Sequence, residues 1–194
     1  MSGLARRVGA VLAVVVSVGL SGCASGPSQE VRATDARATY EVAVELADEV
    51  LAHAREVFPE LTFELNTYPG WGDDWSACSD EPYGGETPPR SFTWHPTRNT
   101  EVLPADPPGT AHLIMPIAQA YLDDGWVIGR DNLDQDHPVL TIRKDGFVIR
   151  FIARDVGVEM YNRLDFFISG PCQYSPDDLM DFDPADPDAY FDRA

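Results

Sequence analysis

The chain lacks the sequence motifs that identify the common catalytic centres. It contains no G-x-S-x-G, no H-E-x-x-H, no phosphate-binding G-x-x-x-x-G-K-[ST] loop and no G-x-G-x-x-G. Its four histidines, at positions 53, 95, 112 and 137, are scattered, and each is expected to be a surface or hydrogen-bonded core residue. We therefore predict a protein that is not an enzyme and that needs no cofactor.

Basic residues are scarce. The chain has 14 Lys and Arg against 32 Asp and Glu, a formal net charge of -18, and Lys144 is its single lysine. An acidic excess of this size excludes general binding to nucleic-acid phosphates. Hydrophobic residues make up 44% of the 194 residues, which is enough for the core of one domain.

No hydrophobic run is long enough to cross a membrane as a helix. The longest, Val8 to Leu20, has 13 residues, whereas a spanning helix needs roughly 20. It follows Arg6 and Arg7 and ends in Leu20-Ser21-Gly22-Cys23, the pattern of a bacterial lipobox. We predict that residues 1–22 are a lipoprotein signal peptide and that Cys23 receives a diacylglycerol and further acyl chains such as palmitate. These would anchor the protein on the extracytoplasmic face of the cell membrane. The alternative is an ordinary signal peptide with a chance cysteine.

Three cysteines are too few for a disulfide-rich miniprotein. Once Cys23 is lipidated, Cys78 and Cys172 remain, 94 residues apart in a compartment where thiols oxidise. We predict a disulfide between them. The alternatives, a metal site or a catalytic thiol, would need further ligands or a base nearby, and neither cysteine has a Cys or His at zinc-binding spacing. The acidic runs at 131–136 and 181–188 depart from the calcium-loop pattern, so no metal site is predicted.

Hydrophobic periodicity divides the rest of the chain into alternating elements. A polar tether over 23–34 precedes a domain at 35–174, and an acidic tail at 175–194 is expected to be mobile, with Phe182, Tyr190 and Phe191 as its potential docking points. Helices are predicted at 35–58 and 110–123, with Pro116 either kinking or starting the second. Strands are predicted at 61–67, 91–97, 126–130, 139–144, 147–154 and 158–169, and residues 68–90 form a loop with eight Gly or Pro.

The dipeptide Asp145-Gly146 predicts a two-residue hairpin, which fixes how the flanking strands pair. In this register one face of the sheet is apolar and the other mixes arginines with aromatic and aliphatic residues. Two amphipathic helices are available to cover the apolar face. The expected fold is therefore an α+β two-layer sandwich, with two helices on one face of an antiparallel sheet of about six strands.

The uncovered face supplies the first candidate binding site. It should carry Arg143, Arg150, Arg154 and Arg163 with Tyr161, which suits an anionic ligand or the carboxylates of a partner. Alternatively, Glu159 and Asp165 neutralise these arginines in cross-strand pairs.

The loop at 68–90 supplies the second. Its Trp71 and Trp75 alternate with acids, a combination able to grip a sugar or a cation. Alternatively, the rings pack over an edge of the core, held there by Cys78.

The order of elements resembles the LppA-type lipoproteins of actinobacteria, including mycobacteria. The residues that carry the resemblance are LSGC at 20–23, Cys78, the Asp-Gly hairpin at 145–146 and the closing FISGPC at 167–172. The scarcity of lysine suits a high-GC genome. The resemblance implies an envelope location and this fold, and it implies no chemistry.

From these observations we expect a membrane-anchored envelope lipoprotein that binds a partner protein or a small ligand without catalysis. A hydrolase acting on envelope polymers is the rival hypothesis, and a clustered Ser, His and Asp or a deep cleft between carboxylates would favour it. A structural spacer without a ligand is the third.

Overall fold

A computed structural model describes residues 27–66, 73–78, 88–104, 109–156, 161–183 and 185–192. At positions 155, 156 and 161 it describes the backbone alone. The predicted signal peptide and Cys23 lie outside the described residues.

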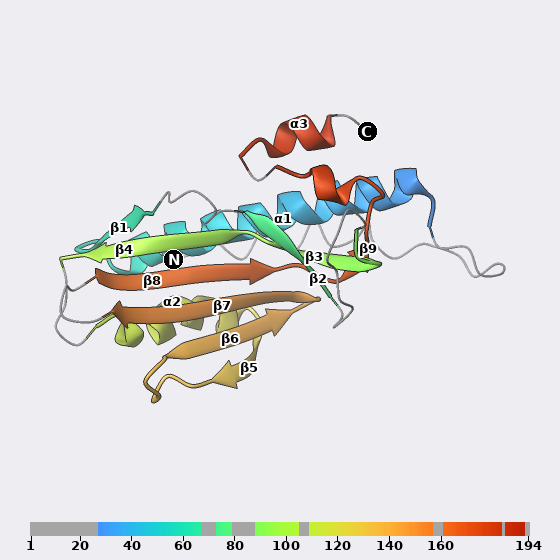
Figure 1. Cartoon of the computed structure of the whole chain (residues 1–194). Helices are drawn as coiled ribbons and strands as arrows, with labels where there is room; N and C mark the ends of the chain where they lie inside the picture. Colours follow the sequence, from blue (N-terminus) through green and yellow to red (C-terminus); the bar gives the residue numbers. More distant parts are fainter. Residues whose placement is uncertain are drawn as a thin grey trace.

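Three helices and nine strands make up this part of the chain (Figure 1). The helices are α1 (Gln29–Val57), α2 (Ala111–Asp123) and α3 (Pro187–Phe191), and a 3-10 turn spans Leu179–Asp181. The strands are β1 (Thr62–Leu65), β2 (Asp74–Ala77), β3 (Ser91–His95), β4 (Thr97–Leu103), β5 (Val127–Asp131), β6 (Val139–Lys144), β7 (Phe147–Val156), β8 (Tyr161–Ser169) and β9 (Gln173–Tyr174).

The first helix begins earlier than its hydrophobic pattern indicates. Ser28 is the N-cap, and its hydroxyl accepts a hydrogen bond from the amide of Val31. The segment before Asp35, which we expected to be tether, therefore forms the first turns of α1 from Gln29 onward. These turns carry few core-facing residues, which is why the periodicity does not show them.

A six-stranded antiparallel sheet forms the larger layer, in the order β1-β4-β8-β7-β6-β5. The predicted hairpin register is confirmed, with Lys144 opposite Phe147 and Ile142 opposite Ile149. Gly146, at φ 86°, supplies the positive backbone angle that the tight turn requires.

Both long helices pack against the same face of this sheet, so the predicted α+β architecture is confirmed. The main core contains the small and aliphatic residues of both helices together with the inward residues of β6, β7 and β8. The sheet residues in it with no exposed surface are Leu140, Ile142, Ile149, Phe151, Leu164, Phe166 and Ile168. Pro116 lies inside α2, which begins five residues earlier at Ala111.

A smaller sheet, β2-β3-β9, stands at one end of the larger one. Its strand β2 lies inside the segment that we expected to be a structureless loop. The predicted disulfide between Cys78 and Cys172 is confirmed, with their Cα atoms 5.9 Å apart, and it ties the end of β2 to the start of β9.

The acidic C-terminal segment packs on the domain instead of extending from it. Phe182, Tyr190 and Phe191, its three potential docking points, are buried with Trp94 in a second core cluster beside α1. Figure 1 shows α3 lying over α1. Between 175 and 192, the described part of the tail is thus folded structure whose aspartates are exposed, apart from the half-buried Asp178, which accepts from the Tyr190 hydroxyl.

Candidate functional site

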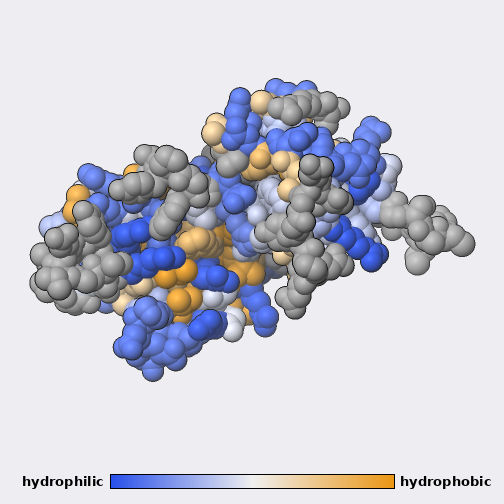
Figure 2. Space-filling view, viewed as in Figure 1, coloured by the Kyte–Doolittle hydropathy of each residue, from blue (hydrophilic) through white to orange (hydrophobic). Residues whose placement is uncertain are grey.

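The face of the large sheet that the helices leave uncovered is called here the open face. Its residues alternate with those of the main core along each strand. They are Thr97, Asn99 and Glu101 on β4; Arg163, Asp165, Phe167 and Ser169 on β8; Val148, Arg150, Ile152 and Arg154 on β7; and Val139, Thr141 and Arg143 on β6. Figure 2 shows hydrophobic residues gathered in the middle of this side of the molecule with hydrophilic residues around them.

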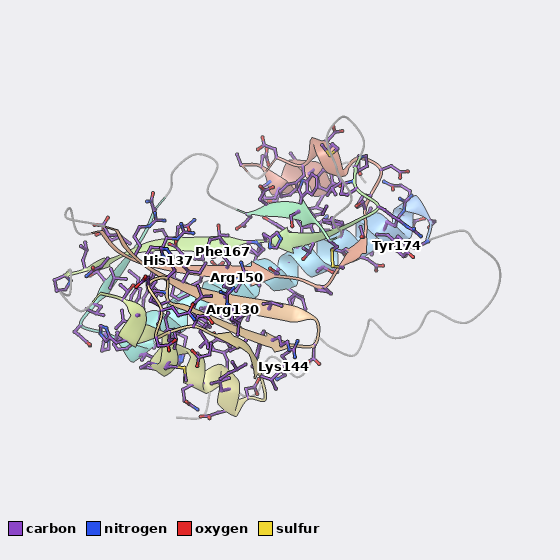
Figure 3. The ribbon with its side chains drawn as sticks, turned by 60° about the horizontal axis from the view of Figure 1, so that its bottom comes forward. Arg130, His137, Lys144, Arg150, Phe167 and Tyr174 are labelled. Atoms are coloured by element: carbon purple, nitrogen blue, oxygen red, sulfur yellow. A yellow bond between two sulfur atoms is a disulfide. The ribbon has the colours of Figure 1, made fainter. Side chains whose placement is uncertain are left out.

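One row of side chains on the open face crosses four strands and contains an aromatic ring, two guanidinium groups and a hydroxyl group. Phe167 pairs with Arg150, Arg150 with Thr141, and Thr141 with Arg130 of β5. Figure 3 shows Phe167, Arg150 and Arg130 in line across the sheet. A bulge between Ile128 and Arg130 brings Arg130 into this row. Such a row offers a hydroxyl group between two guanidinium groups, with an aromatic ring at one end.

Two of the four predicted arginines carry no counter-charge. Within the described parts of the chain, neither Arg143 nor Arg150 makes an ion pair or a side-chain hydrogen bond, and both are exposed. Arg130 is held by Asn132, whose amide oxygen, when turned toward it, accepts from Nε at 2.9 Å. The charges of Arg143 and Arg150 are therefore available to an anion.

The other two predicted arginines are neutralised by Asp165, one of the two acids that the alternative hypothesis names; the other, Glu159, lies outside the described residues. Arg163 Nη2 donates to Asp165 Oδ1 at 3.3 Å, and Arg154 Nε lies 2.9 Å from Asp165 Oδ2. Asp165 has no exposed surface. Burial raises the pKa of this carboxyl, while Arg163 and Arg154 act in the opposite direction. Arg154 thereby links β7 to Asp165 of β8, Arg163 pairs with Asp165 along β8, and both leave little charge for a ligand.

A histidine bridged by two serines stands at the end of the open face where β3 joins β4. The Ser76 Oγ lies 2.6 Å from His95 Nε2, and the Ser169 Oγ lies 2.9 Å from Nδ1. Burial and the nearby Arg150 lower the pKa of His95, so its ring is neutral at pH 7. A neutral ring donates through one nitrogen and accepts through the other, which satisfies both contacts. Ser76 and Ser169 were missed as site residues because 93 residues of sequence separate them and no spacing pattern joins them to His95.

The aromatic candidates belong to the fold in the part of the loop that is described. Trp75 lies on β2 opposite Trp94 and packs against the second core. Trp71 and the side chain of Tyr161 lie outside the described residues. Next to Trp75, Asp73 shares Arg98 with Asp48 of α1, at 2.8 Å and 2.7 Å. This link between β2, β4 and α1 was not predicted, since its three residues are far apart in sequence.

Two of the hollows in the described part of the surface lie away from the open face. One, of about 570 Å³, follows the outer side of α1 from Tyr40 to Ala52. The other, of about 400 Å³, lies between the first turns of α1, residues 88–90 and β9. Over the described ranges, no three His, Cys, Asp or Glu residues gather as metal ligands would.

Comparison with known proteins finds a distant structural similarity. No family model and no curated protein matches it. A similar solved structure is that of the predicted lipoprotein LppA from Mycobacterium tuberculosis, with 13% sequence identity and a TM-score of 0.42. The likeness covers 80% of this chain and 88% of that one. It is a distant similarity of overall fold.

Proposed function

We propose that this protein is a lipid-anchored envelope lipoprotein whose open face binds an anionic partner without catalysing a reaction. The anchor is Cys23 in its lipobox, and the bound partner is an envelope protein or small ligand that presents carboxylates or phosphates. None of the helices in the described ranges has the length and apolar character needed to cross a bilayer. The disulfide between Cys78 and Cys172 supports an oxidising location outside the cytoplasm.

The binding proposal rests on two arginines of the open face that have no ion-pair partner among the described residues. Acidic residues outnumber basic ones by 32 to 14, yet Arg143 and Arg150 face solvent with no carboxylate partner in the described chain. Charge-assisted hydrogen bonds from arginine to a carboxylate or phosphate contribute about 1.5–3 kcal/mol each. The half-buried Phe167 and Ile152 beside them add apolar contact surface.

The test compares capture of envelope components by the lipidated protein and by variants. The unmodified protein should capture a partner from detergent-solubilised envelope. The double variant R143A/R150A should bind this partner with an affinity lower by roughly 10-fold or more. R37Q is the control for loss of a surface cation elsewhere, because Arg37 is exposed on α1, away from the open face. A partner retained equally by both variants would refute the role of the open face. Absence of any partner would favour the structural spacer.

A second candidate function, acyl-transfer hydrolysis, is favoured by the contact between Ser76 and His95. A hydroxyl 2.6 Å from a neutral imidazole is the arrangement of a nucleophile and its general base. Nevertheless, the group on Nδ1 is the Ser169 hydroxyl, not a carboxylate, and neither described hollow is lined by Ser76. We therefore assign this cluster a structural role at the junction of the two sheets.

A fluorophosphonate probe separates the two functions. Such a probe labels activated serines, so the binding function predicts no labelling of the mature protein. Labelling that disappears in S76A and persists in S169A would establish the hydrolase instead.

A further inference from the structure

The distance between the lipid anchor and the folded domain is short. Because α1 begins at Gln29 with its cap at Ser28, five residues, 24–28, separate Cys23 from the helix. Fully extended, the six residue steps from Cys23 to Gln29 span at most about 20 Å. One end of the domain is thereby confined to the neighbourhood of the bilayer.

The start of α1 is fixed to the rest of the domain. Arg32 donates to the Ser175 carbonyl at 2.8 Å and pairs with Asp177 at 2.9 Å. The amide of Asp177 donates to Gln29 Oε1 at 2.9 Å. A tether attached at this point therefore positions the whole domain and not merely a loose helix end.

The surface around this point has the chemistry of a membrane interface. Pro88, Arg90 and Tyr174 line one hollow beside Arg32 of α1. Together with Val31, which precedes Arg32 on the helix, they are called here the anchored end. Val31 and Tyr174 are 43% and 48% exposed, and Figure 3 shows Tyr174 beside the start of α1. Tyrosine favours the bilayer interface, where its ring meets acyl chains and its hydroxyl meets water. In the described chain the exposed Arg90 has no ion-pair partner, which leaves its guanidinium free for a lipid phosphate.

We propose that the anchored end rests on the phospholipid surface, with Val31 and Tyr174 among the lipid headgroups and Arg90 at their phosphates. This inference rests on the lipid anchoring proposed above. A short tether maintains an effective concentration in the millimolar range, so a contact too weak to hold a free protein persists in the anchored one.

The charges nearby indicate which lipids the contact tolerates. Glu30, Asp177 and Asp178 border the anchored end, and Asp177 offsets Arg32. Anionic headgroups would repel these carboxylates. A zwitterionic headgroup still presents its phosphate, but the headgroup as a whole has no net charge. The bilayer to which we assign the contact is therefore zwitterionic.

The experiment measures how near two positions lie to the headgroups. The full lipidated protein is reconstituted into phosphatidylcholine vesicles that contain headgroup spin labels, with a small fluorescent amino acid at position 174 or, as control, at position 127. Val127 is 53% exposed on the edge strand β5, away from the start of α1. Quenching at position 174 should exceed that at position 127 at least several-fold. Equal quenching at the two positions would overturn the proposal.

A second variant tests the role of the short tether. Insertion of 20 Gly and Ser residues after Cys23 should lower quenching at position 174 to the value at position 127. Undiminished quenching would overturn the assignment of the contact to tether length. Flotation of each sample separates the two proposals, since a protein that does not float with the vesicles refutes lipid anchoring. One that floats without quenching at position 174 refutes only the seating of the anchored end.

Discussion

Substitution of Trp94 by phenylalanine should destabilise the domain more than a tryptophan change elsewhere in the core. Trp94 has no exposed surface, and its indole N–H donates to the Ala36 carbonyl at 2.8 Å. Its ring contacts Phe92, Tyr40 and Phe182 with centroid distances of 4.7–5.1 Å. It therefore joins β3, α1 and the C-terminal segment at a single point.

The expected cost has two parts. Phenylalanine cannot donate to the Ala36 carbonyl, and a hydrogen bond of this kind contributes about 0.5–1.5 kcal/mol, since that carbonyl keeps its partner within α1. The smaller ring leaves a space of roughly 40 Å³, which at about 24 cal/mol per Å³ adds about 1 kcal/mol. Together these give a loss of about 1.5–2.5 kcal/mol in the free energy of unfolding.

Urea unfolding in a Cys23→Ala background, which lacks the acyl acceptor, measures this loss. With a urea slope of about 2 kcal/mol per M, the midpoint should fall by roughly 1 M. W126F is the matched control, because Trp126 is also buried, at 8% exposure, but its N–H meets no acceptor among the described residues. If W94F shifts the midpoint no more than W126F does, the hydrogen bond to Ala36 does not stabilise the second core and the reasoning fails.

Three further predictions concern His95 at the junction of the two sheets, the disulfide and the hairpin turn. Burial and Arg150 hold the pKa of His95 below the free value of 6.5, so at low pH the unfolded chain binds a proton more tightly than the folded chain does. The free energy of unfolding should therefore fall as the pH drops below 6.5. Between pH 7.5 and 5.5, the urea midpoint should fall less steeply in H95Q than in the unmodified protein. Replacing Cys78 and Cys172 by serine opens a 94-residue loop and should lower stability by up to about 4–5 kcal/mol; without reductant the native protein should be two protons lighter in mass than its reduced form, and two free thiols would contradict the bridge. G146A should cost more than G125A in thermal unfolding, since both glycines have positive φ but a Cβ at 146 would lie 3.1 Å from that of Pro171 and one at 125 would meet nothing within 4 Å; equal losses would mean that the Pro171 contact relaxes.

The parts of the fold that the sequence predicts are those that local rules determine. The Asp145-Gly146 turn fixes the pairing of β6 with β7, and alternation then assigns every residue of both strands to a face. The two helices follow from their apolar stripes, although that stripe hides the first turns of α1, which are fixed by the cap at Ser28.

The parts that were missed depend on contacts between distant segments. Strand β2 has four residues in a stretch rich in Gly and Pro, and it exists because β3 pairs with it and Cys78 ties it to Cys172. The acidic tail has the composition of a disordered segment, yet its aromatic residues find Trp94 and Tyr40 already buried beside them. Composition counts charges but does not show where a few rings dock.

The same distinction decides which arginines can bind. All four predicted arginines lie on β6, β7 and β8, but only the three-dimensional pairing shows that Asp165 serves both Arg154 and Arg163 and leaves Arg143 and Arg150 open. One of these pairs crosses from β7 to β8 and the other joins two residues of β8, so the position of Asp165 on the sheet determines which arginine charges remain available.

The open face and the anchored end should act independently, because the first is a side of the molecule and the second is one of its ends. In Figure 1 the axis of α1 lies nearly parallel to the long strands β4, β8 and β7, so a domain seated on the start of α1 would hold these strands upright and its open face sideways. A partner would then approach parallel to the membrane, with no need to displace the lipid contact. R143A/R150A should accordingly leave headgroup quenching at position 174 unchanged while it abolishes partner capture, and a charge reversal at Arg90 should do the opposite. If either variant changes both measurements, the two surfaces are one, and the upright arrangement is wrong.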